Sequence, residues 1–149
     1  MHADDALIVN GGTITVTESY EGLEGLTVTI NDGTIDITAS DDGINTAGEK
    51  MELNGGYIHI LAGGDGLDSN GDLTINGGEI YIDGPSDNGN SAIDYGDRSS
   101  AYVNGGTLVA IGSSGMAEVM SDSSKQKVLM VKLGEQMEAG NVVLTDSEG

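Results

Sequence analysis

The 149-residue sequence contains no cysteine, no tryptophan, no phenylalanine and a single proline. Only five residues are lysine or arginine, against 25 aspartates and glutamates, so the formal net charge is −20. A chain this acidic repels a phosphate backbone, which argues against nucleic acid as a partner, and it repels anionic membranes in the same way. Cations are the natural complement of such a surface. Because there is no cysteine and histidine is scarce, a hard divalent cation is expected rather than a soft metal.

Long hydrophobic runs are missing as well. No run of about 18 apolar residues is present, which argues against a membrane-spanning helix, and no secretory signal peptide is recognisable at the N-terminus. High acidity with few aromatic residues is a composition also found in disordered chains. The ordered placement of valine, isoleucine and leucine favours a folded chain instead, and the length fits one domain with a buried core.

Glycine is abundant, and much of it lies in a repeated turn. An Asn-Gly-Gly sequence, or in one case Asn-Asp-Gly, begins at Asn10, Asn31, Asn54, Asn76 and Asn104. The spacings between these asparagines are 21, 23, 22 and 28 residues, and the longest spacing includes a loop-like insertion at residues 85–90. A motif that recurs about every 22 residues indicates a repeat architecture. We expect these asparagines to form a side-chain ladder.

Alignment on the asparagine shows four columns of apolar residues separated by polar ones. These columns lie one residue before the asparagine and four, six and thirteen residues after it, allowing for the insertion and a one-residue deletion in the last column. They contain Val9, Ile30, Leu53, Ile75 and Val103; Ile14, Ile35, Ile58, Ile80 and Leu108; Val16, Ile37, Ile60, Ile82 and Ala110; and Leu23, Ile44, Leu67, Ile93 and Met116. Alternation with a period of two is typical of strands with one buried face.

We therefore predict an all-β fold, a right-handed parallel β-helix (solenoid) of about five rungs over residues 1–120, with rungs stacked at about 4.8 Å. Ala3–Leu7 is interpreted as the second turn of a truncated N-terminal rung. Lys125–Leu133 and Asn141–Thr145 are strand-like. Residues 121–149 are expected to be a C-terminal capping strand pair of the same domain, because the end rung of a solenoid presents unpaired edges.

The second turn of each repeat is rich in acidic residues. Stacking of the repeats predicts one column with Asp5, Glu21, Asp42 and Asp65 and another with Glu24, Asn45, Asp68 and Asp94. Two carboxylates about 5 Å apart repel by about 3 kcal/mol at an effective dielectric near 20. Bound Ca²⁺, which prefers carboxylate, carbonyl and amide oxygens, would remove that repulsion. The alternative is that these residues only form turns and remain solvated.

The outward face of the strand after the asparagine is a second candidate site. Tyr57, His59 and Tyr81 form a diagonal cluster on a flat sheet, where aromatic rings suit the apolar faces of sugars. The alternative is that tyrosine and threonine simply favour exposed strands. An ice-binding surface of regular threonines is disfavoured because the threonine columns end after two rungs.

No catalytic residue is predicted. Lys50 and Arg98 are the only basic residues of the coil region, and neither lies beside the densest acidic columns, which disfavours a polysaccharide lyase. The carboxylate pairs that could hydrolyse glycosides are all equivalent, and a Gly-x-Ser-x-Gly nucleophile motif is absent.

Three segments resemble a known family. They read Ser-Asp-Asp-Gly-Ile-Asn at residues 40–45, Gly-Asp-Gly-Leu-Asp-Ser-Asn-Gly-Asp-Leu-Thr-Ile-Asn-Gly-Gly at residues 64–78 and Gly-Ser-Ser-Gly-Met-Ala at residues 112–117. They are similar to the bacterial carbohydrate-binding domain family of calcium-binding parallel β-helices, and the similarity extends over residues 3–149. The Gly-rich insertion common in that family is reduced here to residues 46–50.

The resemblance implies Ca²⁺ at the acidic turns and binding of cellulose or pectin-like acidic polysaccharide. The implied metal ligands are Asp41, Asp42, Asp65, Asp68 and Asp94, and Glu21, Glu24 and Asn45 lie in the same columns. We expect a secreted or cell-surface, non-catalytic monomer in which Ca²⁺ bridges uronates and Tyr57 and Tyr81 stack on sugar rings. A structural or adhesive module, with Ca²⁺ for stability only, and a polysaccharide lyase are the alternatives.

Overall fold

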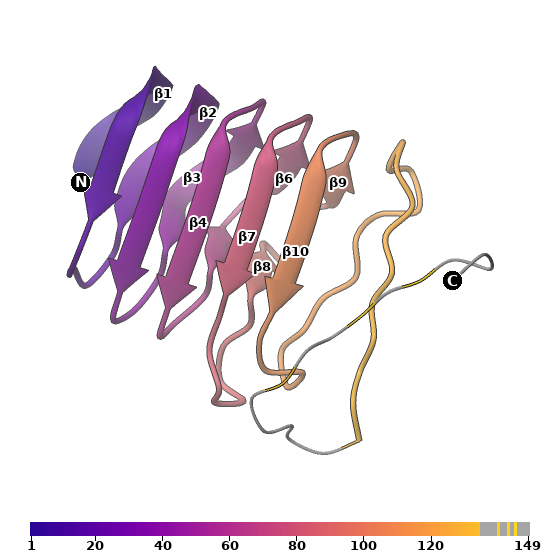
Figure 1. Ribbon diagram of the computed structural model, residues 1–149. Helices are drawn as coiled ribbons and strands as arrows, with labels where there is room; N and C mark the ends of the chain where they lie inside the picture. Colours follow the sequence, from indigo (N-terminus) through magenta and orange to yellow (C-terminus); the bar gives the residue numbers. More distant parts are fainter. Residues whose placement is uncertain (135–139, 141–142, 144, 146–149) are drawn as a thin grey trace.

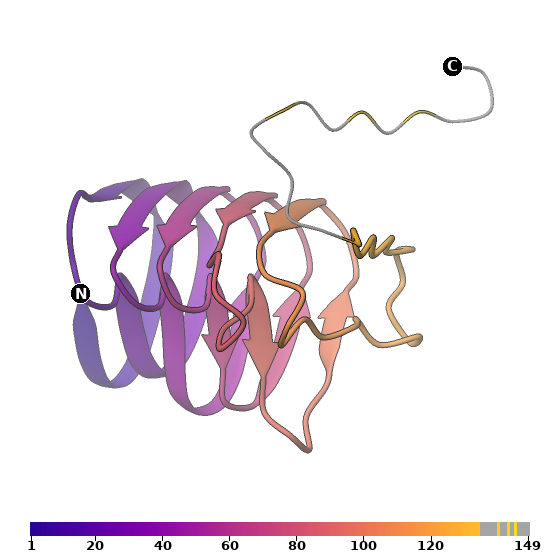
Figure 2. The same cartoon turned by 90° about the horizontal axis from the view of Figure 1, so that it is seen from below.

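The computed structural model describes residues 1–134, 140, 143 and 145 and contains ten strands and no helix within them. The strands are β1 (His2–Val16), β2 (Leu23–Ala39), β3 (Ile44–Leu53), β4 (Tyr57–Ala62), β5 (Leu67–Ser69), β6 (Asp72–Ile75), β7 (Glu79–Asp83), β8 (Ile93–Tyr95), β9 (Ala101–Val103) and β10 (Thr107–Ile111). All of their pairings are parallel, and the chain winds as a β-solenoid whose coils stack along one axis (Figures 1 and 2). The predicted parallel β-helix is confirmed.

The solenoid makes about four turns, slightly fewer than the five rungs expected. The front sheet, which faces the viewer in Figure 1, consists of the C-terminal halves of β1 and β2 followed by β4, β7 and β10. Five strands therefore stack in it, but the described chain forms no strand after β10, so the coil that begins there is not completed by strand pairing.

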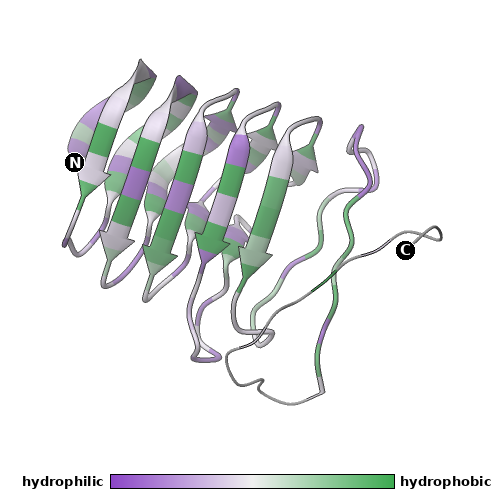
Figure 3. Ribbon diagram, viewed as in Figure 1, coloured by the Kyte–Doolittle hydropathy of each residue, from purple (hydrophilic) through white to green (hydrophobic). Residues whose placement is uncertain are grey.

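The apolar columns of the sequence are columns of the structure. Val9 pairs with Ile30, which pairs with Leu53, and the register continues through Ile75 to Val103. Leu23, Ile44, Leu67 and Ile93 are paired in the same way and are at least nine-tenths buried. Figure 3 shows apolar and polar residues alternating along the front strands up to β7, whereas β10 is apolar over most of its length. Met116 departs from its predicted column, since it lies beyond the last strand pairing and is 52% exposed.

Asn-Gly-Gly turns join the front sheet to the strands before it, and the predicted asparagine ladder is confirmed. The Nδ2 of Asn31, Asn54, Asn76 and Asn104 each donates to the Oδ1 of the preceding asparagine, at 2.7, 2.9, 2.8 and 3.0 Å. Gly56 has φ of +89°, and a Cβ there would lie 2.7 Å from the Gly33 oxygen. Glycine is therefore required by both the backbone conformation and the rung spacing.

The N-terminal rung differs from its prediction. His2 and Ala3 pair with Glu24 and Gly25, and pairing resumes with Ala6 opposite Thr27, so Asp5 lies at a corner and not above Glu21. The assignment of Asp5 to the acidic column is wrong. Met1 lies beside the acidic second turn instead, because its carbonyl oxygen accepts a hydrogen bond from the N–H of Glu24. The chain then needs few residues to reach Asn10, which explains the short first repeat.

Residues beyond β10 lie against the last coil. The N–H of Ser121 donates to Ala101 O at 2.8 Å, and that of Gln126 donates to Val103 O at 3.0 Å. These bonds satisfy part of the edge of β9. The strand predicted at Lys125–Leu133 is not formed, since its apolar side chains are 40–66% exposed and no pairing joins it to β10. Most of Asn141–Thr145 lies outside the described residues.

The search for membrane-spanning helices, made on the described residues, found no helix with the length and apolar character that a crossing requires.

Candidate functional site

The outward side chains of β4 and β7 form an aromatic cluster on the front sheet. Period-two alternation turns Ile58 and Ile60 into the core and leaves the residues between them on the surface. Tyr57 pairs in register with Glu79, and His59 pairs with Tyr81, so the two tyrosines are diagonal neighbours. Their ring centroids are 5.7 Å apart and the rings are tilted by 43°. The structure thus brings together all three residues expected to contact sugar.

This cluster is accessible and held in place. Tyr57 is 44% exposed and Tyr81 is partly exposed. The Nδ1 of His59 lies 2.8 Å from Asp36 Oδ1 on the neighbouring strand, which fixes the imidazole beside Tyr81. Among the described residues, neither tyrosine hydroxyl makes a hydrogen bond, so both hydroxyls are available to a ligand.

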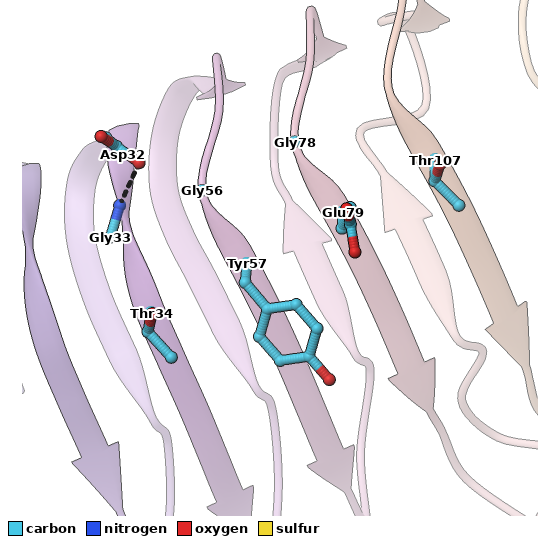
Figure 4. A pocket seen from close by; sticks show the side chains of 8 residues that line it. All are labelled: Asp32, Gly33, Thr34, Gly56, Tyr57, Gly78, Glu79 and Thr107. Carbon is cyan, nitrogen blue, oxygen red and sulfur yellow. Dashed lines mark hydrogen bonds between the residues drawn. The ribbon is translucent and has the colours of Figure 1, made fainter.

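A shallow hollow lies next to Tyr57 at the start of the front strands (Figure 4). It is lined by Asp32, Gly33, Thr34, Gly56, Tyr57, Gly78, Glu79 and Thr107. The ring of Tyr57 lies along β4, between Thr34 on one side and Glu79 on the other. Turn glycines form one end of the hollow, where side chains would otherwise fill the space.

Sequence reasoning did not single out Asp32, Thr34, Glu79 or Thr107 for this site. The signal was present, because Thr34, Tyr57, Glu79 and Thr107 each follow the Gly turn and occupy one column. Asp32 replaces the first glycine of the turn in one rung, and its Oδ1 accepts from the N–H of Gly33 at 2.8 Å. Because the residues of this column differ in type, the column was harder to recognise in the sequence than the diagonal of aromatic residues.

The acidic turn lies at the other end of the front strands, after Ala39 and Ala62. Backbone bonds between successive coils, such as Gly22 N to Asp42 O at 3.0 Å, place the second turns directly above one another. Gly43 permits this approach, since a Cβ there would lie 2.6 Å from Gly66 O. One carboxylate oxygen each from Glu21, Asp41 and Asp42 lies within 4.8 Å of the others.

The donors around this group fit a hard cation. All of the grouped atoms are carboxylate oxygens, which suit Ca²⁺. Asn45 Nδ2 donates to Glu21 Oε1 at 3.2 Å, while Asn45 Oδ1 is buried and has no hydrogen-bond partner in the described part of the chain. An unpartnered buried acceptor beside three carboxylates is what a cation would satisfy. Burial also raises the pKa of Glu21, although the bond from Asn45 opposes that rise.

Asp42, Asp65 and Asp68 continue the acidic group along the turn. Desolvation raises the pKa of Asp65 to about 6, opposed by the N–H of Ser91, which donates to its carboxylate at 2.5 Å. Burial raises the pKa of Asp68 to about 7, and the charges of Asp42, Asp65 and Asp94 add to that rise. Asp42 is 9% exposed, and its pKa is raised by the same desolvation. These carboxyls are destabilised as anions unless a cation approaches.

Glu24 lies outside the group of three converging carboxylates, although it interacts with Glu21 of that group. Its Oε2 lies 2.6 Å from Nδ1 of His2, and this hydrogen bond lowers the pKa of Glu24. Glu24 keeps its place in register with Asn45.

Comparison with known protein families matches residues 1–147 to the family described as carbohydrate-binding domain-containing protein. The chain belongs to this carbohydrate-binding domain family. No curated protein and no solved structure matches it. The family description together with the β-solenoid fold supports polysaccharide as a partner.

One further acidic residue of the carbohydrate-binding domain escaped sequence reasoning. Asp94 pairs with Asp68 as predicted, and Glu118, from the segment after β10, adds a carboxylate near it. Glu118 Oε2 accepts from the N–H of Tyr95 at 3.2 Å, and burial followed by the charge of Asp94 raises its pKa. Glu118 belongs to no repeat column, so only the path of the chain over the last coil places it here.

The aromatic hollow and the acidic turn of the domain are separate. Tyr57 begins β4, and the acidic turn follows the end of that strand at Ala62. Five residues of extended chain span about 17 Å. A cation at Glu21, Asp41 and Asp42 therefore does not touch a sugar ring stacked on Tyr57, and any joint contact requires a polymer that spans the front sheet.

Proposed function

We propose that this domain binds polysaccharide on its front sheet without catalysing a reaction, with sugar rings stacking on Tyr57 and Tyr81. The observation behind the proposal is the exposed, tilted tyrosine pair, 5.7 Å apart, beside a shallow hollow. Exposed aromatic rings bind the apolar face of a pyranose, and their free hydroxyls bond to sugar hydroxyls. An open, strand-borne surface suits a long chain such as cellulose better than a small enclosed molecule. An extracellular location follows from that type of ligand.

Ca²⁺ at the acidic turn is part of the proposal. Glu21, Asp41, Asp42 and Asn45 would hold the ion. Asp65, Asp68 and Asp94 would make the electrostatic potential around the ion more negative. The ion would supply positive charge that offsets carboxylate repulsion and gives uronates of a pectin-like chain a contact at that edge. The turn residues would orient the ion, while the tyrosines act alone at the opposite end.

The non-catalytic assignment is supported by the positions of the basic residues. Lys50, one of the two basic residues of the coil region, donates to Glu52 Oε2 at 2.9 Å on β3, which is not part of the front sheet. The two carboxylate columns lie in a turn and not across the tyrosine hollow. The acidic turn therefore provides no acid–base pair for a sugar on the aromatic surface.

Retention on insoluble cellulose and on polygalacturonate, measured with added Ca²⁺ and with chelator, tests the proposal. Tyr57→Ala is expected to weaken retention on cellulose about tenfold, equivalent to about 1.4 kcal/mol. Tyr102→Ala on β9 is the matched control and should bind like the unmodified chain, since Tyr102 lies outside the front sheet. Absence of retention on both polymers would refute polysaccharide binding.

A structural or adhesive module is the second candidate, favoured by the separation of the acidic turn from the tyrosines. In that case Ca²⁺ would raise the melting temperature while neither polymer retained the chain. The same retention experiment, paired with thermal unfolding, separates the two functions. Formation of unsaturated uronate from pectate would instead indicate a lyase.

A further inference from the structure

The front strands around the aromatic hollow carry acidic residues and no lysine or arginine. Asp32 and Glu79 line the hollow on either side of Tyr57. Asp36 and Asp83 lie on the same outward face, and the front-strand segments at residues 13–16, 34–39, 57–62, 79–83 and 107–111 contain no lysine or arginine. The anionic surroundings of Tyr57 are therefore a local property of the site as well as a consequence of the net charge of −20.

His59 does not change this balance. It is the single residue of those front-strand segments that can become cationic, and its Nδ1 lies 2.8 Å from Asp36 Oδ1. A protonated His59 is thus neutralised by its own strand neighbour and offers no net positive charge to a ligand. A uronate stacked on Tyr57 would meet Glu79 across one strand spacing of about 4.8 Å, and the front-strand segments offer it no lysine or arginine.

A hollow lined by an exposed tyrosine and two carboxylates has the chemistry of an ammonium site. Ring faces attract cations through their quadrupole, and carboxylates bind protonated amines by charge-assisted hydrogen bonds. Tyr57, Asp32 and Glu79 supply both elements within one hollow of a sugar-binding surface. We propose that this hollow selects polysaccharide with protonated primary amines, that is, a glucosamine-type chain, over neutral and uronate chains. The inference rests on the proposed function, because it names the substrate class of the same surface.

Titration calorimetry with hexasaccharides tests the selection. The probes are a glucosamine hexamer, the same hexamer with its amines acetylated, a cellulose hexamer and a galacturonate hexamer, all in chelator at a pH where the amines are protonated. The glucosamine hexamer is expected to bind at least about tenfold more tightly than its acetylated form, equivalent to about 1.4 kcal/mol. The preference should decline as salt is raised, because exposed charges are screened.

Two double variants separate a specific site from general attraction to an acidic protein. Asp32→Asn with Glu79→Gln removes the two carboxylates of the hollow and should abolish the preference for the glucosamine hexamer over its acetylated form. Glu18→Gln with Asp122→Asn makes the same change in charge at exposed residues outside the hollow and should retain the preference. Unchanged melting temperatures would show that all variants fold.

The outcomes are distinct. Equal or tighter binding of the cellulose or acetylated hexamer overturns the amine inference and leaves the proposed function standing. An equal loss of the preference in both double variants also overturns it, because that result indicates non-specific attraction to the net charge. Failure of every hexamer to bind refutes the inference together with polysaccharide binding itself.

Discussion

Asp65 and Asp68 are the residues on which pH acts most strongly. Their pKa values are raised to about 6 and about 7, chiefly by desolvation in the stacked turn. Both carboxyls bind a proton more tightly in the folded chain than in the unfolded chain, where an aspartate has a pKa of about 3.9. The stabilisation due to protonation is complete at pH values below the unfolded-chain pKa. It is lost as the pH rises through the folded-chain pKa values of about 6 for Asp65 and about 7 for Asp68.

In chelator, the melting temperature should therefore fall as pH rises from about 4 to about 8. Asp68→Asn keeps the shape of the side chain and removes its titration, so the variant should melt higher than the unmodified chain at the alkaline end and show a flatter profile. Asp122→Asn at an exposed turn is the control and should leave the slope unchanged. A steep slope retained in Asp68→Asn would contradict this assignment. Thermal unfolding followed by circular dichroism measures both.

Gly56 shows how one residue limits the rung spacing. Gly56→Ala should destabilise the fold by about 1–3 kcal/mol, because alanine is strained at positive φ. Its Cβ would also approach the Gly33 oxygen. Gly134→Ala, where nothing lies within 4 Å of the added Cβ, is the matched control and should change stability little. Urea denaturation gives the two free energies of unfolding, and equal values would refute the steric argument.

The asparagine ladder acts at the scale of the element. Each amide bonds to the next coil, so four bonds of 2.7–3.0 Å run along the edge of the solenoid and hold successive turns in register. Lys125 N–H donates weakly to Asn104 Oδ1 at 3.4 Å and continues the line beyond the last strand. The ladder tolerates the insertion at residues 85–90 because that loop leaves the coil elsewhere, between β7 and β8.

Asn54→Ala removes two ladder bonds, one donated to Asn31 and one accepted from Asn76. We expect a loss of about 1–3 kcal/mol in the free energy of unfolding, from about 0.5–1.5 kcal/mol for each bond. Asn88→Ala, in the exposed insertion, removes an asparagine outside the ladder and serves as the control. Chemical denaturation of both variants measures the difference. Equal losses would show that the ladder adds no stability of its own.

For the whole molecule, the net charge of −20 and the stacked acidic turn oppose compaction together. Salt screens the dispersed charges, whereas the proposed divalent cation would act at Glu21, Asp41 and Asp42, where the carboxylates converge. Both effects should stabilise the fold, but only the second should depend on individual turn residues.

Millimolar Ca²⁺ should raise the melting temperature more than sodium chloride of equal ionic strength. Asp42→Asn should remove most of the calcium-specific increment, because it loses one of the three grouped carboxylates while its oxygen still accepts from the N–H of Asp65. Asp122→Asn again provides the control for one lost charge. Calorimetric melting with each salt measures the increments, and an increment of equal size in Asp42→Asn would contradict the metal assignment.

Repetition made much of the fold predictable. The apolar residue four positions after each asparagine, isoleucine in four repeats and Leu108 in the fifth, predicts stacked repeats with one buried side, and the parallel register confirms this. The ends were less predictable because they break the repeat. Asp5 was placed above Glu21 by local similarity to the acidic turn, whereas pairing of Met1 and His2 with β2 moves it to a corner. Lys125–Leu133 contains an apolar run like that of a strand, but only isolated backbone bonds such as Gln126 N to Val103 O join it to the coil.

The sequence alone determined the class of fold, the asparagine ladder and the columns of acidic and aromatic residues, because in a solenoid equal positions in successive repeats become spatial neighbours. Tertiary structure decided what repeat position does not encode. It joined Asp32 and Glu79 to Tyr57 in one hollow, brought Glu118 to Asp94, turned Glu24 toward His2 and separated the acidic turn from the tyrosines by the length of a strand. Those relations depend on how side chains from different columns meet across the coil, and repeat spacing contains no information on that.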